Sequence, residues 1–254
     1  MIVVHFSGLS CDMQKIRTLT DKYGVLLIED AAHALGGRYQ GQKIGSCQYS
    51  DMTVLSFHPV KSITSAEGGA VLTNNNDLQQ KLMLFAKHGV TRDPDVIQGE
   101  SHGPWYYQQV ELGYNYRLSD LHGALGLSQL KKVDEFIAKR RQLAANYFQH
   151  LSDLPISLPL ESALSDSAWH LFMVELQQHD RKQIFKKLQA KKIGVNVHYI
   201  PIHLQPYYQN LGFSQGDFPV AEAFYQRALT LPLFPTMTAS EQMYVVDTLK
   251  EVLQ

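Results

Sequence analysis

The sequence predicts an α/β fold with a mainly parallel sheet, followed by a smaller α+β carboxyl-terminal domain. The run Val25–Ile28 is uninterruptedly apolar, which is typical of a parallel strand covered on both faces. It follows a strand and a helix, so the chain opens with a βαβ unit. A proline-punctuated stretch, Ser152–Pro159, is the best boundary. We therefore expect domains at residues 1–151 and 152–254.

The first unit is justified by local signals. Ile2–Phe6 is a short apolar strand, and Asp12 can cap a helix that Gly24 ends. Val25–Ile28 is the next strand, and Asp30 lies just beyond it. Ligands of parallel sheets bind beyond the carboxyl ends of the strands. Asp30 is therefore a candidate site residue.

The segment Asp51–Gly69 supplies a second strand end. Its β-forming residues predict a strand that stops at Pro59, because proline has no N–H to donate. Lys61 follows in a turn rich in hydroxyl side chains. We expect Ala70–Thr73 to be a short strand that runs back.

The remaining elements follow from helical spacing, caps and alternation. A helix should end near Gly89, a long loop should span Val90–Glu111, and a long helix capped by Ser119 should break near Lys131–Asp134. In the second domain we expect, in chain order, a strand at Trp169–Leu176, a helix capped by Asp180, a strand at Val195–Tyr199, and helices at Ala221–Leu229 and Glu241–Leu253. Thr238 should cap the last helix in a capping box with Glu241.

The composition excludes some classes of partner. The formal net charge of −1 gives no electrostatic reason to expect nucleic acid or an anionic membrane, and no apolar run has the length of a membrane span. Cys11 and Cys47 do not have metal-binding spacing, and His198 with His203 lacks a third ligand, so we expect no metal. Two free thiols fit the reducing cytoplasm.

Asp30 and Lys61 together point to pyridoxal phosphate (PLP). A lone lysine in a polar loop would be a surface residue, but here an acid ends the neighbouring strand. A lysine can form a Schiff base with PLP, and a carboxylate can keep the pyridine nitrogen protonated so that the ring accepts electrons. We predict these two residues to be catalytic and cofactor-binding.

Three blocks resemble one known family. EDAAHA, SFHPVKSITSAEGGAVLT and GYNYRLSDLHGALGLSQL are similar in wording and separation to the DegT/DnrJ/EryC1/StrS sugar aminotransferases. The resemblance implies fold type I, the aspartate aminotransferase-like fold of PLP-dependent transferases, and a homodimer with shared active sites. The family is longer at its amino end by roughly a third, so this chain would carry a partial large domain.

The resemblance also implies roles for individual residues. It assigns three further cofactor-binding residues, His33, Ser56 and Asn115, the last reaching the partner's site. It assigns three substrate-binding residues, Arg117, Tyr199 and His203. Without the resemblance, His33 could be a packed histidine, Ser56 a serine satisfied by the sheet edge, and Gly113–Arg117 a polar turn.

The implied reaction transfers an amino group from L-glutamate to C4 of a UDP-linked 4-keto-6-deoxy-N-acetylhexosamine, as in the biosynthesis of pseudaminic acid-type sugars. The alternative is a truncated, non-catalytic remnant, or half of a split enzyme whose amino-terminal fragment is a separate chain. A PLP-dependent sugar dehydratase would have histidine in place of the lysine, and Lys61 argues against it.

Overall fold

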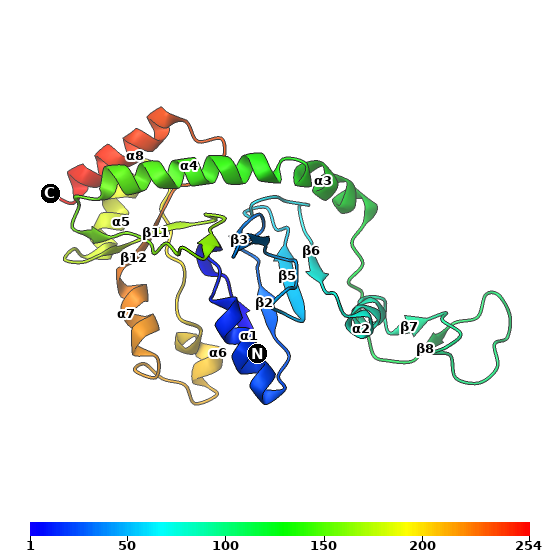
Figure 1. The fold of residues 1–254 in the computed structure, drawn as a ribbon. Helices are drawn as coiled ribbons and strands as arrows, with labels where there is room; N and C mark the ends of the chain where they lie inside the picture. The colour runs from blue at the N-terminus through cyan, green and yellow to red at the C-terminus, as the bar shows by residue number, and fades with distance from the viewer.

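The structure, a computed structural model, describes residues 1–254 and confirms the α/β fold. Its main sheet contains β1 (Ile2–Val4), β2 (Ile28–Asp30), β5 (Met52–Ser56) and β6 (Gly69–Leu72), in the order β1-β2-β5-β6. The first three strands are parallel, and β6 runs back against β5, as predicted (Figure 1). The sheet is therefore mainly parallel.

The predicted βαβ unit is present. Helix α1 (Met13–Tyr23) joins β1 to β2. The side chain of Asp12 accepts a hydrogen bond from the backbone N–H of Lys15, and Gly24 ends the helix in the left-handed conformation that glycine adopts without strain. Both caps were expected from the sequence.

The prediction of a doubly covered strand at Val25–Ile28 is wrong in two respects. The strand begins at Ile28, because Leu27 exchanges hydrogen bonds with Asp51 outside the ladder. It is also not in a sheet covered on both faces. Val25 and Leu26 are exposed, and Ile2 in β1 is 67% exposed. One face of this sheet is apolar and open in the chain.

The opposite face of the sheet carries a buried polar network. Glu29 hydrogen-bonds to the imidazole of His5 at 2.7 Å and accepts from the hydroxyl of Thr53 at 3.0 Å. The hydroxyl of Ser50 also donates to Glu29. These bonds connect β1, β2 and β5, so they help to fix the register that brings the three strand ends together.

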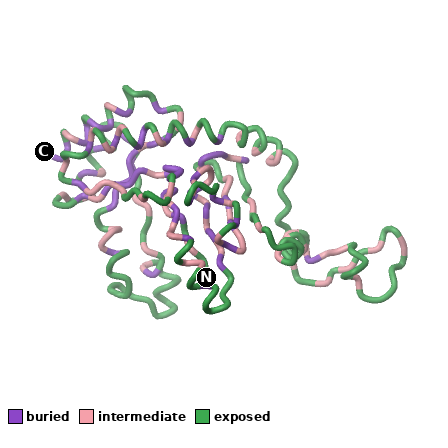
Figure 2. The backbone as a smooth tube through the Cα atoms, in the orientation of Figure 1, coloured by how far each residue is buried: buried purple, intermediate pink, exposed green.

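A peripheral segment extends from the sheet. Helix α2 (Asn76–Ala86) leads to a hairpin of β7 (Val90–Thr91) and β8 (Gln108–Gln109), so the expected loop Val90–Glu111 contains two short strands. The segment projects away from the body and is mostly exposed (Figures 1 and 2). Helices α3 (Asp120–Leu130) and α4 (Val133–Leu151) follow, and the predicted Ser119 cap and break are confirmed.

The carboxyl-terminal half is built on a second, antiparallel sheet. Its strands are β9 (Ile156–Ser157), β11 (Phe172–Leu176) and β12 (Ala228–Leu231), in the order β12-β11-β9. Its helices are α5 (Arg181–Ala190), α6 (Pro206–Gln209), α7 (Pro219–Arg227) and α8 (Ala239–Val252). The caps predicted at Asp180 and Thr238 are present.

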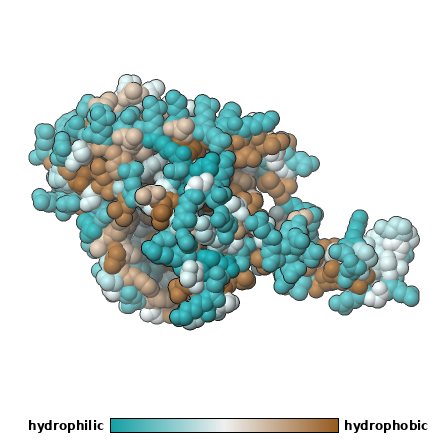
Figure 3. Space-filling view, in the orientation of Figure 1, coloured by the Kyte–Doolittle hydropathy of each residue, from teal (hydrophilic) through white to brown (hydrophobic).

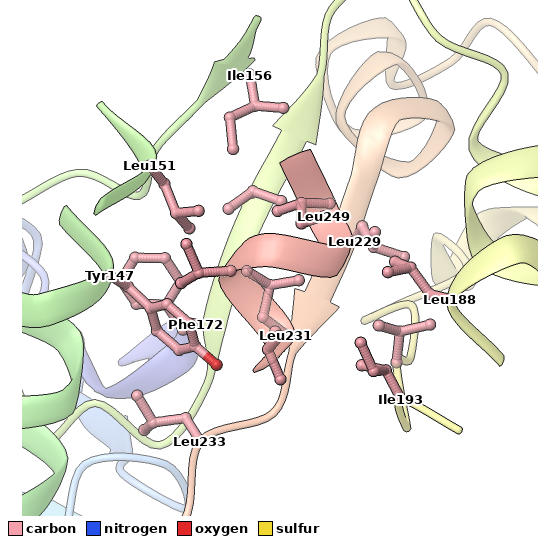
Figure 4. Packing of buried hydrophobic residues seen from close by; sticks show 14 of the residues in the cluster. Tyr147, Leu151, Ile156, Phe172, Leu188, Ile193, Leu229, Leu231, Leu233 and Leu249 are labelled. Atoms are coloured by element: carbon pink, nitrogen blue, oxygen red, sulfur yellow. The ribbon is translucent and has the colours of Figure 1, made fainter. Parts of the chain in front are cut away.

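The largest core lies in this half. A cluster of 22 buried residues includes Phe172 of β11, Leu229 of β12 and Leu249 of α8 (Figure 4). Tyr147 and Leu151 of α4 belong to the same cluster, so this long helix packs against the carboxyl-terminal sheet. None of the helices is both long and apolar enough to cross a membrane.

Two expectations for this half are wrong. Val195–Tyr199 is not a strand, since only one bridge, between Asn196 and Thr230, pairs it with β12. Ala228–Leu231 is a strand, whereas the helix predicted at Ala221–Leu229 included its first two residues. A small sheet of β3 (Arg38–Tyr39), β4 (Gln42–Lys43) and β10 (Ser165–Asp166) joins segments from both halves of the chain.

Candidate active site

The carboxyl ends of β1, β2 and β5 meet at one edge of the main sheet. Asp30 is in register with Val4 on one side and Val54 on the other. Because successive side chains alternate between faces, Asp30 shares its face with Val54 and Ser56, opposite the Glu29 network. The side chain of Asp30 accepts a hydrogen bond from the N–H of Ala32 at 3.1 Å.

Lys61 reaches the same edge. It lies in the turn between β5 and β6, where its N–H donates to the carbonyl of His58 at 3.0 Å. Burial lowers the pKa of its amine, and the negative charge of Asp30 partly offsets that shift. The carboxylate of Asp30 is therefore close enough to the amine of Lys61 for their charges to interact.

His33 is the buried imidazole of this site. The N–H of Ser7 donates to its Nδ1 at 3.3 Å, so the neutral ring carries its proton on Nε2, which lies 3.4 Å from the hydroxyl of Tyr199. Burial and then the positive charge of Lys61 lower the pKa of His33 to about 4, against a smaller opposing effect of Asp30. The ring is consequently uncharged at neutral pH.

The carboxyl-terminal half contributes Tyr199 to the same place. Its ring lies 6.3 Å from that of His33, with 28° between the planes. The neighbouring His198 hydrogen-bonds to the hydroxyl of Thr230 at 2.8 Å, and burial together with the charge of Lys61 lowers its pKa. Two residues far apart in sequence, Tyr199 and His33, are thus brought together.

His203 has a different environment from the other candidates. Its imidazole is buried, lies 2.7 Å from the carboxylate of Glu222 and packs against Phe218. The structure thus gives this side chain a partner within its own half. No group of three potential ligands that could hold a metal is present in the structure.

Ser56, Asn115 and Arg117 are placed less centrally. Ser56 ends β5, and its hydroxyl accepts from the N–H of His58 at 3.4 Å. Asn115 and Arg117 are exposed, and the backbone of Asn115 bridges to that of Lys87 beside α2. No side-chain hydrogen bond connects either residue to Asp30 or Lys61 within the chain.

Sequence reasoning missed two aromatic neighbours of His33. The ring of Phe6 lies 6.1 Å from that of His33 and 6.0 Å from that of Tyr199. The ring of His170 lies 4.4 Å from that of His33. Neither residue lies in a motif, and the separation of 137 positions between His33 and His170 leaves no local signal for their contact.

The fold and this edge define an α/β protein whose candidate site lies at the carboxyl ends of parallel strands, where sheets of this kind bind their ligands. The chain belongs to the DegT/DnrJ/EryC1/StrS aminotransferase family, whose model matches residues 1–250.

Characterised relatives are similar along the whole chain. The UDP-4-amino-4,6-dideoxy-N-acetyl-beta-L-altrosamine transaminase of Campylobacter jejuni is 36% identical over 256 residues, which cover 99% of this chain and 65% of that protein. The spore coat polysaccharide biosynthesis protein SpsC of Bacillus subtilis is 33% identical over 261 residues, covering 100% and 66%. The chain thus spans about two thirds of the length of these relatives.

Solved structures show the same relation. Helicobacter pylori PseC, an aminotransferase of pseudaminic acid biosynthesis, superposes with a TM-score of 0.90 at 31% identity, covering 99% of this chain and 66% of that one. The PMP form of the sugar aminotransferase Spr1654 from Streptococcus pneumoniae also gives 0.90, at 28% identity, covering 99% and 68%. These matches confirm the fold type that the sequence motifs implied.

Proposed function

We propose that the chain carries the catalytic lysine and acid of a PLP-dependent sugar-nucleotide aminotransferase. The observation that carries the proposal is the meeting of Lys61 and Asp30 at one strand edge beside a neutral His33. Membership of an aminotransferase family supports it, as does the existence of PLP and PMP forms of Spr1654.

The residues present fit PLP. Lys61 offers a partly buried amine for the aldehyde, and Asp30 offers a carboxylate for the pyridinium nitrogen. His33 offers a flat, uncharged ring that can lie against an aromatic cofactor. Ser56 has a hydroxyl hydrogen free to donate to a phosphate, because it accepts from His58. We assign these four residues to cofactor binding.

When bound, PLP supplies an electron sink that makes the amino-group carbon acidic. The chain's own part is to move the proton and to hold the charges. Burial of Lys61 favours its neutral form, which a proton acceptor requires, and Asp30 keeps a negative charge opposite it. The rings of Tyr199 and Phe6 lie beside that of His33.

For substrates we propose L-glutamate and a UDP-linked 4-keto-6-deoxy-N-acetylhexosamine, in a pathway of the pseudaminic acid type. The names of the Campylobacter and Helicobacter relatives support this choice. Tyr199, beside His33, is the substrate-binding residue with the strongest geometric support. We keep Arg117 and His203 as candidates, the latter acting with Glu222 to fix the loop that follows Tyr199.

We also propose a homodimer in which Asn115 serves the partner's site. The exposed position of Asn115 and the apolar surface of α3 support this arrangement. Leu121 on α3 is 84% exposed, and Figure 3 shows hydrophobic residues at the surface where α3 lies.

Free thiols at Cys11 and Cys47 support a cytoplasmic setting. The domains proposed are residues 1–151 and 152–254.

The alternative function is a non-catalytic remnant or half of a split enzyme. One observation favours it: the open apolar face of the main sheet, where Ile2 and Val4 are exposed. A separate amino-terminal fragment could cover this face, since contiguous exposed apolar surface marks interaction sites. On this alternative the chain alone binds no PLP, and binding returns when such a fragment is added.

The absorption spectrum of the purified chain with PLP tests the proposal. We expect a visible band that glutamate bleaches and that Lys61→Ala abolishes. Lys43→Ala, which removes a lysine paired with Asp134 on the surface, is the control and should keep the band. Absence of the band from folded protein, alone and with the amino-terminal third of a relative, would refute the proposed function.

A further inference from the structure

Ser7, beside the candidate site, hydrogen-bonds to residues of both halves of the chain. Ser7 donates its N–H to Nδ1 of His33 at 3.3 Å, and its carbonyl accepts from the N–H of His170 at 2.9 Å. Ser7 has a φ of 59°, which is uncommon for a residue other than glycine. The backbone of Ser7 therefore hydrogen-bonds to the side chain of His33 through its N–H and to the backbone of His170 through its carbonyl.

His170 packs directly on His33. The two ring centroids are 4.4 Å apart, with 42° between the planes, and His170 is only 6% exposed. Its Nδ1 is buried without a hydrogen-bond partner. Because this atom makes no hydrogen bond, His170 acts on His33 through the contact between the two rings.

Arg140 of α4 fixes the backbone that carries His170. Its buried guanidinium donates through Nη1 to the carbonyls of Trp169 at 3.2 Å, His170 at 3.1 Å and Leu233 at 2.9 Å. A backbone held in this way gives the ring of His170 little freedom to move away from His33. The contact between the rings is consequently a rigid one.

We propose that His170 is a positioning residue that holds His33 in one ring orientation and in the tautomer that carries its proton on Nε2. A ring flip of His33 would replace Nδ1 by a C–H opposite the N–H of Ser7, and the other tautomer would put an N–H there. The face of His170 blocks the displacement that would relieve either clash. The inference rests on the proposed function only for the role of His33 beside the cofactor.

The surroundings of the pair keep both rings neutral. Burial, then the charges of Lys61 and His198, lower the pKa of His33, and the opposing effect of Asp30 does not cancel them. Arg140 and Lys61 disfavour a proton on His170, which is in any case kept neutral by burial. With both rings neutral, Nε2 of His33 is left as a donor toward Tyr199 or toward a ligand at that edge.

Nitrogen-15 NMR of the imidazoles in the PLP-free chain tests the proposal. In the wild-type chain the signal of His33 should show a single tautomer with Nδ1 unprotonated. In His170→Ala we expect a mixture of tautomers and an affinity of His33 for protons at least tenfold higher. His170→Phe keeps the ring and should keep the single tautomer.

A folded His170→Ala protein with an unchanged tautomer and titration of His33 would overturn the proposal, because His170 would then only fill space. If His170→Ala does not fold, His170→Val, which retains more apolar volume, is read in the same way. PLP binding is measured separately. A chain that shows the His33 change but binds no PLP retains this inference and loses the proposed function.

Discussion

At the scale of single residues, the pKa of His33 responds to the charges of Lys61 and Asp30. Lys61 lowers the pKa of His33 and Asp30 raises it. Lys61→Ala should therefore raise the pKa of His33 above its value of about 4, and Asp30→Asn should lower it further. Titration of the His33 imidazole by NMR measures both shifts without cofactor. Lys43→Ala should leave the titration unchanged, and shifts of the same sign in both site variants would contradict the arrangement.

The site was predictable from sequence only where its residues belong to local motifs. Asp30 ends β2 and Lys61 lies in the turn after β5, and the sequence places each beside an apolar run that predicts a strand. Tyr199 is half exposed and lies in a segment whose path the sequence did not reveal, yet it reaches His33. The contact between His170 and His33 depends on the docking of the two halves, which no spacing in the sequence encodes.

At the scale of elements, the junction at Ser7–Gly8 depends on a glycine. Gly8 has a φ of 107°, and a Cβ there would lie 2.8 Å from the backbone nitrogen of Trp169. Gly8→Ala should therefore destabilise the fold by about 3 kcal/mol, from backbone strain and displacement of the junction. Urea unfolding measures the change.

Gly41→Ala is the matched control for this prediction. Gly41 also has a positive φ, 79°, but a Cβ there meets nothing within 4 Å. Its substitution should cost only the left-handed strain, about 1 kcal/mol. Equal losses of stability at the two positions would show that the close approach of Gly8 to Trp169 has no energetic weight.

Elements were predictable where their signals are local. The caps at Asp12, Ser119, Asp180 and Thr238 depend on residues within one helical turn, and all four are present. The strand β12 was missed because its four residues are all buried, so it lacks the alternation that distinguishes a strand from a helix end. In Val195–Tyr199 apolar and polar residues alternate because only one face of the segment packs against the protein. The segment nevertheless has no continuous ladder of strand hydrogen bonds.

At the scale of the whole molecule, His33 makes stability depend on acidity. Its folded pKa of about 4 lies below the ordinary value of 6.5, so the unfolded chain binds the proton first as the pH falls. Above pH 6.5 this difference in proton binding does not change the free energy of unfolding. As the pH falls to 4, it lowers that free energy by about 3 kcal/mol. Unfolding free energies at pH 7 and 5 should differ less in His33→Phe. An equal difference in both proteins would contradict the shifted pKa.

The proposed dimer makes a quantitative prediction about mixed subunits. Asn115 is exposed on the segment beside α2 and has no side-chain hydrogen bond to Lys61 or Asp30 of its own chain. If it serves the partner's site, Asn115→Asp places a negative charge against the PLP phosphate there and inactivates that site. Lys61→Ala inactivates its own site instead.

A mixture of the two inactive variants should then recover activity. In a two-fold dimer each mixed pair has one site with intact Lys61 and intact Asn115, so random exchange restores about a quarter of the wild-type rate. The readout is the glutamate-driven bleaching of the PLP band after the subunits have exchanged. If Asn115 acted within its own chain, each of the two sites of a mixed pair would carry one damaged residue and neither would be whole, because the Lys61→Ala subunit lacks the amine and the Asn115→Asp subunit lacks the amide. Full exchange without recovery would therefore place Asn115 outside the partner's site.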